Sequence, residues 1–228
     1  MNTITYTPPA LGAGAYAIPE AARYLKIGAG RLRSWFVADT QKQSAFLADF
    51  KPIEGCTAIS FYDLVDSQVA VQLRGMNISM QRIRRVYNAM KAGFGLRHPF
   101  CSELLFTDGK DLFLKSAQAV EDASFIDILT RQHYFTEVLT PFLGHIDYDH
   151  AVGMAQRWHI FPNVVIDPRV FFGKPVIEGS RISTYTLARE YIANGNDSDI
   201  VADLYDVSSL QVLSAFEFER DMGNLGAA

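Results

Sequence analysis

YAIPEAARYLKIGAGRLRSW, residues 16–35, predicts two short helices separated by a tight turn. Pro19 followed by Glu20 favours a helix start, because proline fits the first helical position and a carboxylate stabilises the amino end of a helix. Gly28 interrupts the pattern after two turns, and a second helix is expected over residues 31–37. This order of helix, glycine turn and helix is the plan of a helix-turn-helix.

The apolar and polar positions of this helix pair predict which side chains face outward. Ala22 takes the place where the two helices touch, and Ile27, Leu32 and Trp35 take positions that need apolar packing. The polar residues that we predict to contact DNA are Arg23, Lys26, Arg31, Arg33 and Ser34. Arginine there can approach phosphates or bind guanine edges in the major groove. Lys26 stands where the pattern usually has glycine, and no Ser or Thr caps the second helix, so a helix pair that only builds a core is the alternative.

Two longer helices are predicted after a short hairpin or wing over residues 38–60. Ser60 provides a start that is typical of a capping box, and the helix behind it ends at Gly75. Ser79 caps the next helix. The basic residues of that helix, also predicted DNA contacts, are Arg82, Arg84 and Arg85. With 3.6 residues per turn the first and third of them share one side, so a phosphate-binding stripe and a solvated helix face are both open interpretations.

The second half of the chain predicts a different mixture of elements. Asp-Gly is a strong turn signal, so residues 106–113 predict a β-hairpin. Residues 164–177 contain short strand-like pieces broken by proline and glycine. Three short helices are predicted to follow, at residues 184–194, 198–205 and 208–219.

The last of these helices has a defined start and a predicted apolar face. Ser208 with Gln211 three residues later is typical of a capping box. The residues predicted to form its buried stripe are Leu210, Leu213 and Phe216. The fold class that follows is mainly α with short β-hairpins, in which two helix-turn-helix-like modules are joined by a mixed segment.

Charge is divided unevenly along the chain. Residues 1–100 hold twelve Lys and Arg against six Asp and Glu, whereas residues 101–228 hold nine against nineteen. The first part therefore carries +6 and the second −10, which together give the net charge of −4. This asymmetry favours a polyanion as the partner of the first part, although charges that simply scatter over a solvated surface are the alternative.

Composition and motifs favour a non-catalytic intracellular protein. With 49% hydrophobic and 20% charged residues, the chain has the composition of an ordinary globular protein. Cys56 and Cys101 are too few and too far apart to predict a disulfide framework or a zinc site. The sequence shows no secretion signal and no membrane-spanning run, so we expect a cytoplasmic location and no membrane partner.

No arrangement of residues predicts catalysis, a metal or a cofactor. Histidines and aspartates are densest at residues 145–150, but no helix spacing sets their geometry. His98, His133 and His159 are isolated, and a satisfied or exposed histidine accounts for each. We therefore expect no enzyme activity, no cofactor and no bound metal.

A specific resemblance begins at Asp167-Pro168-Arg169 and continues through FGKPVIEGSRI, residues 172–182. These residues resemble a domain of unknown function that is a predicted antitoxin, whose signature is roughly G-x-P-V-I-x-G-T-R-I. Ser180 replaces the usual threonine and keeps its hydroxyl, whereas Glu178 often has a basic or neutral counterpart. The three predicted helices downstream fit the same domain.

The N-terminal part resembles the MerR-type winged helix-turn-helix, through residues 18–35 and through SFYDLV at residues 60–65. The two parts in this order resemble the larger VapB-type antitoxins, which pair with a PIN-like ribonuclease toxin. The organisation that we predict is a flexible arm at 1–15, a MerR-like winged helix-turn-helix at 16–100, a mixed connecting segment at 101–160 and an antitoxin-type helix-turn-helix domain at 161–228. The resemblance implies that the chain blocks a toxin and represses the shared promoter.

The expected protein is thus a homodimeric antitoxin that binds a double-stranded DNA operator through its basic half and the toxin through its acidic half. Phe171 and Phe172 are the expected anchors for the toxin. The C-terminal residues predicted to contact DNA are Arg181, Ser208, Ser209 and Gln211. Because their surroundings are acidic, dimerisation or partner binding by this module is also open. The alternatives are a MerR-like ligand-responsive regulator that senses through residues 101–160, and a protein-binding adaptor without DNA contact.

Overall fold

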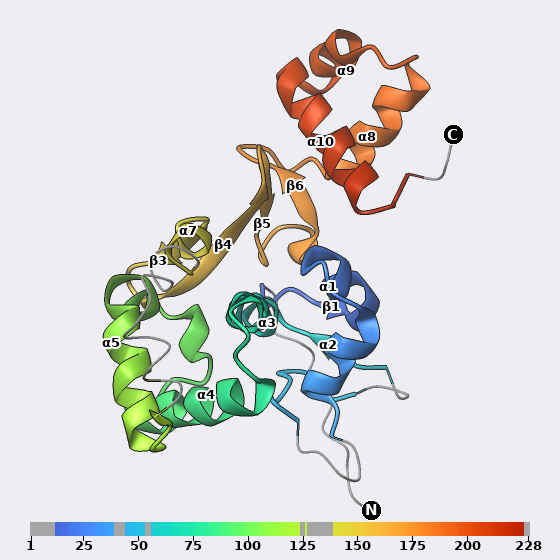
Figure 1. Cartoon of the computed structure of the whole chain (residues 1–228). Helices are drawn as coiled ribbons and strands as arrows, with labels where there is room; N and C mark the ends of the chain where they lie inside the picture. The colour runs from blue at the N-terminus through green and yellow to red at the C-terminus, as the bar shows by residue number, and fades with distance from the viewer. Residues whose placement is uncertain (1–11, 39–43, 53–55, 124–125, 127–138, 226–228) are drawn as a thin grey trace, which may run out of the picture.

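The computed structural model describes residues 12–38, 44–52, 56–123, 126 and 139–225. Figure 1 shows an N-terminal helical part, a small antiparallel sheet, and three C-terminal helices beyond one end of that sheet. The predicted class, mainly α with short hairpins, is confirmed in this broad form. No helix within these ranges is long and apolar enough to cross a membrane.

The N-terminal part begins with the predicted pair of short helices, α1 (Ile18–Tyr24) and α2 (Ala29–Phe36). Strand β1 (Tyr16–Ala17) precedes them and pairs antiparallel with β2 (Ala58–Ile59). The segment predicted as a wing therefore supplies a strand that pairs with the start of the helix pair. Residues 39–43 and 53–55 of that segment lie outside the described residues.

Two longer helices, α3 (Phe61–Gly75) and α4 (Met80–Phe94), begin at the predicted caps. The backbone N–H of Asp63 donates to Ser60 Oγ at 3.1 Å, and the backbone N–H of Ser60 donates to Asp63 Oδ2 at 3.0 Å. This reciprocal pair is a complete capping box, which satisfies two of the N–H groups that a helix start leaves without partners. The caps and the end of α3 at Gly75 are confirmed.

The hairpin predicted at residues 106–113 is wrong, because this segment lies inside helix α5 (Glu103–Ala119), which follows the short turn η1 (Pro99–Cys101). The buried residues of α5 that recur every fourth position are Leu105, Gly109, Phe113 and Ala117. That spacing places these residues on one face of the helix. The burial of this apolar face outweighs the local preference of Asp-Gly for a turn. A kink remains at Asp108, whose φ is −126° and ψ is 21°.

The sheet has the order β3-β4-β5-β6, and each pair of neighbours is antiparallel. Its strands are β3 (Ile146–Asp149), β4 (Met154–Phe161), β5 (Val164–Ile166) and β6 (Pro175–Ile177), preceded by the short helix α7 (Thr140–Leu143). All residues of β5 and β6 are buried, as expected for short apolar strands covered on both faces. The strand-like pieces predicted between residues 164 and 177 are confirmed.

The three predicted C-terminal helices are confirmed as α8 (Thr184–Ala193), α9 (Ser198–Tyr205) and α10 (Ser209–Asp221). Ser208 and Gln211 form the predicted capping box of α10. The helices pack on one another, and α8 and α10 also contact strands β6 and β5. The sheet therefore carries the helical group at one end (Figure 1).

The predicted buried stripe of α10 is wrong in register. The helix buries Val212, Ala215 and Phe218, and the Phe218 ring lies beside Tyr24 of α1 and Phe161 of β4. Leu210 and Leu213 are instead 64% and 37% exposed. The third predicted residue, Phe216, is half-buried beside the ring of Tyr191, at 5.0 Å between ring centroids. The helix has two apolar faces, and the docking of its neighbours decides which one becomes the core.

The start of the described chain and the short turn η3 (Phe171–Gly173) meet at Tyr16. The Tyr16 ring is fully buried and lies so close to Gly173 that a Cβ there would stand 2.0 Å from Tyr16 Oη. The backbone N–H of Ala15 donates to the carbonyl oxygen of Phe172 at 3.1 Å. Residues 12–15, the described end of the arm that was predicted to be flexible, are therefore held against the C-terminal part.

Candidate nucleic-acid interface

The predicted DNA-contacting residues of the helix pair lie on its outer surface. Ala22, Leu32 and Trp35 are buried, as expected for positions that pack inside the helix pair. The polar residues that remain exposed are Arg23, Lys26, Arg31, Arg33 and Ser34. The four cations among them make no ion pair with any residue in the described ranges. Their charges are available to a polyanion.

The turn between α1 and α2 has the backbone shape that its sequence pattern requires. Lys26 has φ 52°, in the left-handed region where glycine is usual, and its N–H donates to the carbonyl oxygen of Arg23 at 3.0 Å. The N-terminal cap of α2 is Gly28, which supplies no side-chain hydrogen bond. A lysine at the turn projects a cation at the junction of the two helices, where glycine would leave none.

The arginines of α4 have a structural partner. Arg82 and Arg85 both contact Asp122, with Nε–Oδ1 at 3.6 Å and Nη2–Oδ2 at 2.5 Å. The Asp122 side chain is 4% exposed, so these cations neutralise a buried carboxylate just beyond α5. Arg84 lies between them and is half-buried. Phosphate binding by this stripe would compete with the pairing of Asp122.

The predicted contacts on the C-terminal module divide into one exposed cation and three engaged polar side chains. Arg181 is exposed in the turn between β6 and α8. Ser208 and Gln211 bond each other in the capping box, and Gln211 Nε2 also donates to the carbonyl oxygen of Glu178 at 3.1 Å. Ser209 Oγ donates to Asp199 Oδ1 at 2.5 Å. These three side chains hold the module together at the position where a recognition helix would meet base edges.

The motif at residues 167–182 has structural roles for several of its polar groups. Arg169 donates to Asp167 through Nε at 2.9 Å and through Nη2 at 2.8 Å. Lys174 Nζ pairs with Glu20 Oε1 and so joins this motif to α1. Ser180 Oγ donates to the carbonyl oxygen of Ile177 at 3.1 Å, which explains why a hydroxyl residue can replace threonine there.

The predicted toxin anchors lie on η3 and are exposed. Phe171 is 56% exposed and Phe172 is 71% exposed, both with positive φ values of 47° and 56°. Large side chains in the left-handed region are uncommon, and exposed neighbouring phenylalanines leave apolar surface in water. The geometry leaves both rings free for a partner.

A buried polar centre that the sequence did not predict lies beneath α3. His98 Nδ1 lies 2.8 Å from Asp66 Oδ2, and its Nε2 lies 3.1 Å from Asp49 Oδ1. Tyr87 Oη donates to Asp66 at 2.6 Å, and Arg97 pairs with Asp49 at 2.7 Å. His98 is 4% exposed and Asp66 is 1% exposed. Each ring nitrogen faces a carboxylate, which is the arrangement of an imidazolium ion between two acceptors.

The protonation of this centre follows from its contacts. Burial alone would lower the pKa of His98, but hydrogen bonds to Asp49 and Asp66 outweigh it and raise the pKa to about 9. Burial tends to raise the pKa of Asp49, yet hydrogen bonds from His98 and Ser60 hold the pKa below its usual value. His98 is therefore charged at neutral pH.

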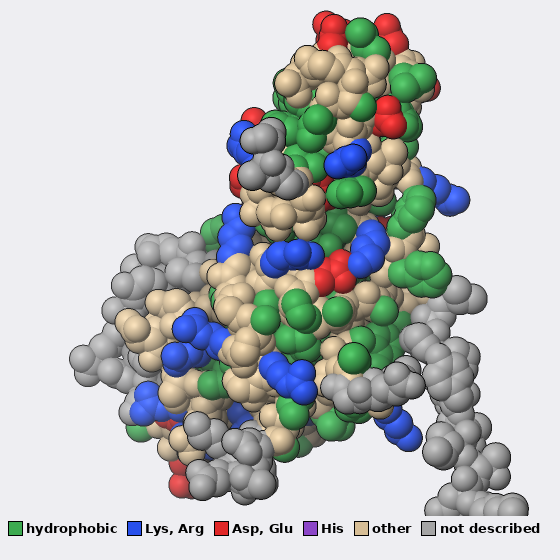
Figure 2. All heavy atoms as spheres, turned by 90° about the vertical axis from the view of Figure 1, so that its right-hand side faces the viewer, with side chains coloured by type: hydrophobic (Ala, Val, Ile, Leu, Met, Phe, Trp, Pro, Cys, Tyr) green, Lys and Arg blue, Asp and Glu red, His purple; other side chains and the backbone are tan. Residues whose placement is uncertain are grey.

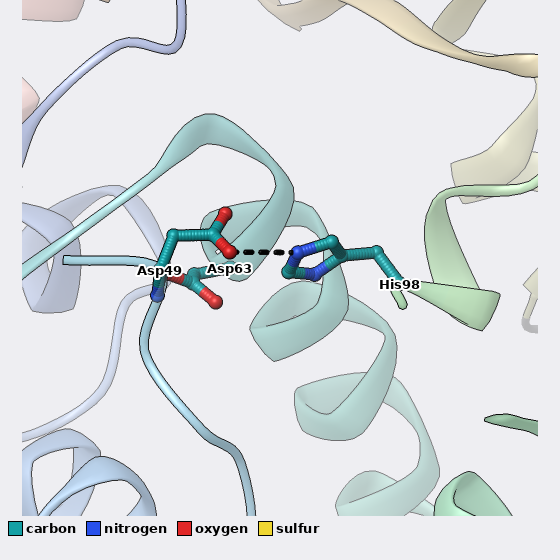
Figure 3. A group of neighbouring side chains, drawn as sticks. All are labelled: Asp49, Asp63 and His98. Atoms are coloured by element: carbon teal, nitrogen blue, oxygen red, sulfur yellow. Dashed lines mark hydrogen bonds and ion pairs between the residues drawn. The ribbon is translucent and has the colours of Figure 1, made fainter. Parts of the chain in front are cut away.

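Asp49, Asp63 and His98 place three potential ligand atoms within 4.8 Å of one another, and Figure 3 shows their side chains together. A metal ion would need the lone pair of an unprotonated ring nitrogen, whereas the pKa of His98 is about 9. Asp63 Oδ2 already accepts two backbone N–H groups, from Asp49 and Ser60, each at 3.0 Å. These contacts favour a structural role over metal binding. The three residues hold the segment at Asp49 against the start of α3.

A cavity of about 320 Å³ opens where α1, α3, β4 and α10 meet. The rings of Tyr24 and Phe218 stack at its wall, with centroids 6.4 Å apart. Gln68 also lines it, and the Oε1 atom of that side chain is buried without a hydrogen-bond partner in the described ranges. Lys26, in the turn between α1 and α2, lines the cavity. A molecule bound in the cavity would therefore contact the helix pair.

Comparison with known proteins links this architecture to antitoxins. The chain is 27% identical to "Putative antitoxin VapB45" of Mycobacterium tuberculosis over 224 residues, which covers 89% of this chain and 92% of that protein. It is 22% identical to "Uncharacterized protein Rv2308" of the same organism, with 90% of each chain covered. The crystal structure of Rv2018 from Mycobacterium tuberculosis superposes with a TM-score of 0.71 at 26% identity, covering 88% of this chain and 96% of that one.

The C-terminal module also matches a family model. Residues 164–218 match the family described as "Protein of unknown function (DUF433)". This range begins at β5 and ends within α10, so it includes the motif at residues 167–182 and the three C-terminal helices. The DUF433 domain is present in this chain, and the similarity over most of its length supports an antitoxin of a toxin–antitoxin system.

Proposed function

We propose that this chain is an autoregulatory antitoxin that binds operator DNA through the outer surface of α1 and α2 and neutralises a PIN-like ribonuclease. The observation that carries DNA binding is the set of four exposed cations on one helix pair, which have no ion-pair partner in the described ranges. Similarity to an antitoxin over 89% of the chain supports the toxin-neutralising part. A homodimer would present two such surfaces to an inverted repeat.

The charge distribution also supports DNA binding by the N-terminal part and toxin binding by the C-terminal part. The first hundred residues carry +6 and the remainder −10, so phosphates are attracted to one part and repelled by the other. Figure 2, which faces the right-hand side of Figure 1, shows Lys and Arg side chains mainly over the middle and lower part of this face, with acidic side chains at the upper tip. Phe171 and Phe172, which are exposed on η3, are proposed to contribute to toxin contact.

Salt titration of DNA binding tests the proposal. We expect the double variant Arg31→Ala, Arg33→Ala to bind a duplex from the chain's own upstream region at least about tenfold more weakly, and to lower the salt slope by about 2 units, because each lost phosphate contact removes about 0.9. Fluorescence anisotropy between about 50 and 200 mM salt measures both quantities.

The matched control is Arg189→Ala, Arg220→Ala, which removes two exposed arginines from α8 and α10. This control changes the net charge equally but leaves the helix pair intact, so its salt slope should stay close to that of the parent chain. Equal binding by the parent chain and the Arg31/Arg33 variant would contradict DNA recognition by α1 and α2. A parent chain that binds no duplex even at low salt would favour the protein-binding adaptor.

The cavity beside Lys26 favours one second candidate, a ligand-responsive regulator. Trp158 and Ile160 of the segment predicted as a sensor contribute to its wall, together with residues of α1 and α10. The wall is mixed, because Lys26, Gln68 and Asp221 line it beside the apolar side chains, and these polar groups can bind and orient a polar small molecule. A compound that raises the melting temperature of the parent chain but not of Trp158→Ala, and that changes operator affinity, would support this function.

A further inference from the structure

Helices α9 and α10 expose four large apolar side chains that are not part of the core. On α9, Ile200 is 52% exposed and Leu204 is 64% exposed. On α10, Leu210 is 64% exposed and Leu213 is 37% exposed. The interior of the module is filled by other residues of the same helices, such as Val201 and Val212. These four side chains do not build the core, and together we name them the α9–α10 apolar surface.

The two pairs of side chains are arranged in rows that start close together. Ile200 and Leu204 are four residues apart and share one side of α9, while Leu210 and Leu213 are three apart and share one side of α10. Ser209 donates to Asp199 across the two helix starts. This hydrogen bond brings the starts of the two helices together, and Ile200 and Leu210 are the next residues of each helix.

The charged residues in the segment that carries this surface are all acidic. Residues 198–217 contain no Lys or Arg. The acidic residues of that range, all of them exposed, are Asp199, Asp203, Asp206 and Glu217. Acidic side chains are visible at the tip of the C-terminal module in Figure 2, at the height of α9 in Figure 1. An apolar surface on a segment with charges of one sign is complementary to an apolar groove bordered by cations.

The same features disfavour nucleic acid as the occupant. The serine and glutamine side chains at the start of α10, Ser208, Ser209 and Gln211, are already hydrogen-bonded within the protein. The exposed residues that remain on the first turns of α10 are leucines, which offer no hydrogen bonds to base edges or phosphates. The four exposed carboxylates of the same segment would repel a phosphate backbone.

We propose that the α9–α10 apolar surface is the principal docking site for the toxin, whose matching surface has an apolar groove bordered by Lys and Arg. This inference rests on the proposed antitoxin function and assigns the toxin site to a specific surface. A second copy of this chain is a poor occupant, because a two-fold interface would place identical acidic segments against each other. Buried leucine anchors would supply the affinity, and the carboxylates would speed association.

Binding of the protein encoded by the neighbouring reading frame tests the inference, with the full-length chain immobilised for surface plasmon resonance. We expect Leu204→Ser, Leu210→Ser to weaken binding at least about 100-fold, because truncation of an anchor commonly costs tenfold or more. Asp203→Asn, Asp206→Asn should mainly slow association and reduce its dependence on salt. Circular dichroism and thermal melting establish that each variant is folded.

The matched control is Leu47→Ser, Val152→Ser, which makes the same kind of change at side chains that are 73% and 66% exposed elsewhere. This variant should bind as the parent chain does. Binding that survives in the Leu204/Leu210 variant would overturn the docking site while leaving the antitoxin function intact, and loss of binding in Phe172→Ala alone would place the site on η3. A parent chain that does not bind the neighbouring protein would overturn both.

Self-association is measured in the same series. If the parent chain is a dimer at micromolar concentration by light scattering and Leu204→Ser, Leu210→Ser is a monomer, the surface joins two copies and the toxin site is overturned. An unchanged oligomeric state together with lost toxin binding is the expected result.

Discussion

Replacing His98 with alanine is expected to lower the free energy of unfolding by about 3–5 kcal/mol, the range found when one partner of a buried ion pair is removed. Asp66 is fully buried, and it would keep only its bond from Tyr87 at 2.6 Å and a weak contact with Cys101. Asp49, in the segment that packs on α3, would also lose its hydrogen bond with His98 Nε2. Urea denaturation at pH 7 measures the change.

The pH dependence of stability distinguishes a charged His98 from a neutral one. Because folding raises the pKa of His98 from 6.5 to about 9, its contribution is fully present below pH 6.5 and is lost as pH rises through about 9. His98→Gln keeps hydrogen-bonding groups without a titrating charge. The difference in stability between the parent chain and this variant should therefore shrink from pH 6.5 to pH 9, and a constant difference would contradict the imidazolium.

Substituting Gly173 with alanine should destabilise the chain by about 2–5 kcal/mol. Gly173 has φ +85°, where a Cβ costs about 1–2 kcal/mol. Forcing a methyl group into a filled site costs a further 1–3 kcal/mol or so. The Cβ would lie 2.0 Å from Tyr16 Oη and 2.8 Å from Tyr16 Cζ, and the ring is fully buried and cannot swing into solvent. Thermal unfolding followed by circular dichroism measures the loss.

Gly179 provides the internal comparison for this prediction. It has φ +77°, but no atom lies within 4 Å of the position that a Cβ would take. Gly179→Ala should therefore lose only the backbone preference, about 1–2 kcal/mol. Similar losses of stability in both variants would mean that the Tyr16 ring moves aside to accept the methyl group. The close packing of Tyr16 against Gly173 would then contribute little to the free energy of unfolding.

Local signals in the sequence were sufficient for most elements. Ser60, Ser79 and Ser208 cap helices as predicted, because a side-chain oxygen that binds a free N–H group acts within four residues of its own position. The helix pair at its predicted place and the outward cations of α1 and α2 follow from the same short-range periodicity. The DNA and toxin contacts themselves remain proposals.

The misjudged elements are those that tertiary packing decides. Asp108-Gly109 is a local turn signal, yet a buried face every fourth residue in α5 overrides it. On α10 the choice between Leu210 and Val212 as the inward residue depends on how α8 and β5 dock, which no window of the helix contains. Apolar periodicity alone offered both alternatives.

The buried centre at His98 was missed for a different reason. Asp49, Asp66 and His98 are separated by 17 and 32 positions, so no motif spacing connects them. One signal was available, because Asp66 lies between Val65 and Val69 on the apolar side of a predicted helix. A carboxylate at such a position must find a partner, and the sequence did not say which one.

The contact between Tyr16 and Gly173 has a mechanical consequence. Tyr16 is separated by one residue from the start of α1 at Ile18, and Gly173 is separated by one residue from the start of β6 at Pro175, the strand that leads to α8. The fully buried Tyr16 ring therefore joins the start of the N-terminal helix pair to the segment that leads into the C-terminal helices. A displacement of one against the other would have to move this ring out of its packed site, so the contact limits the freedom of the two ends.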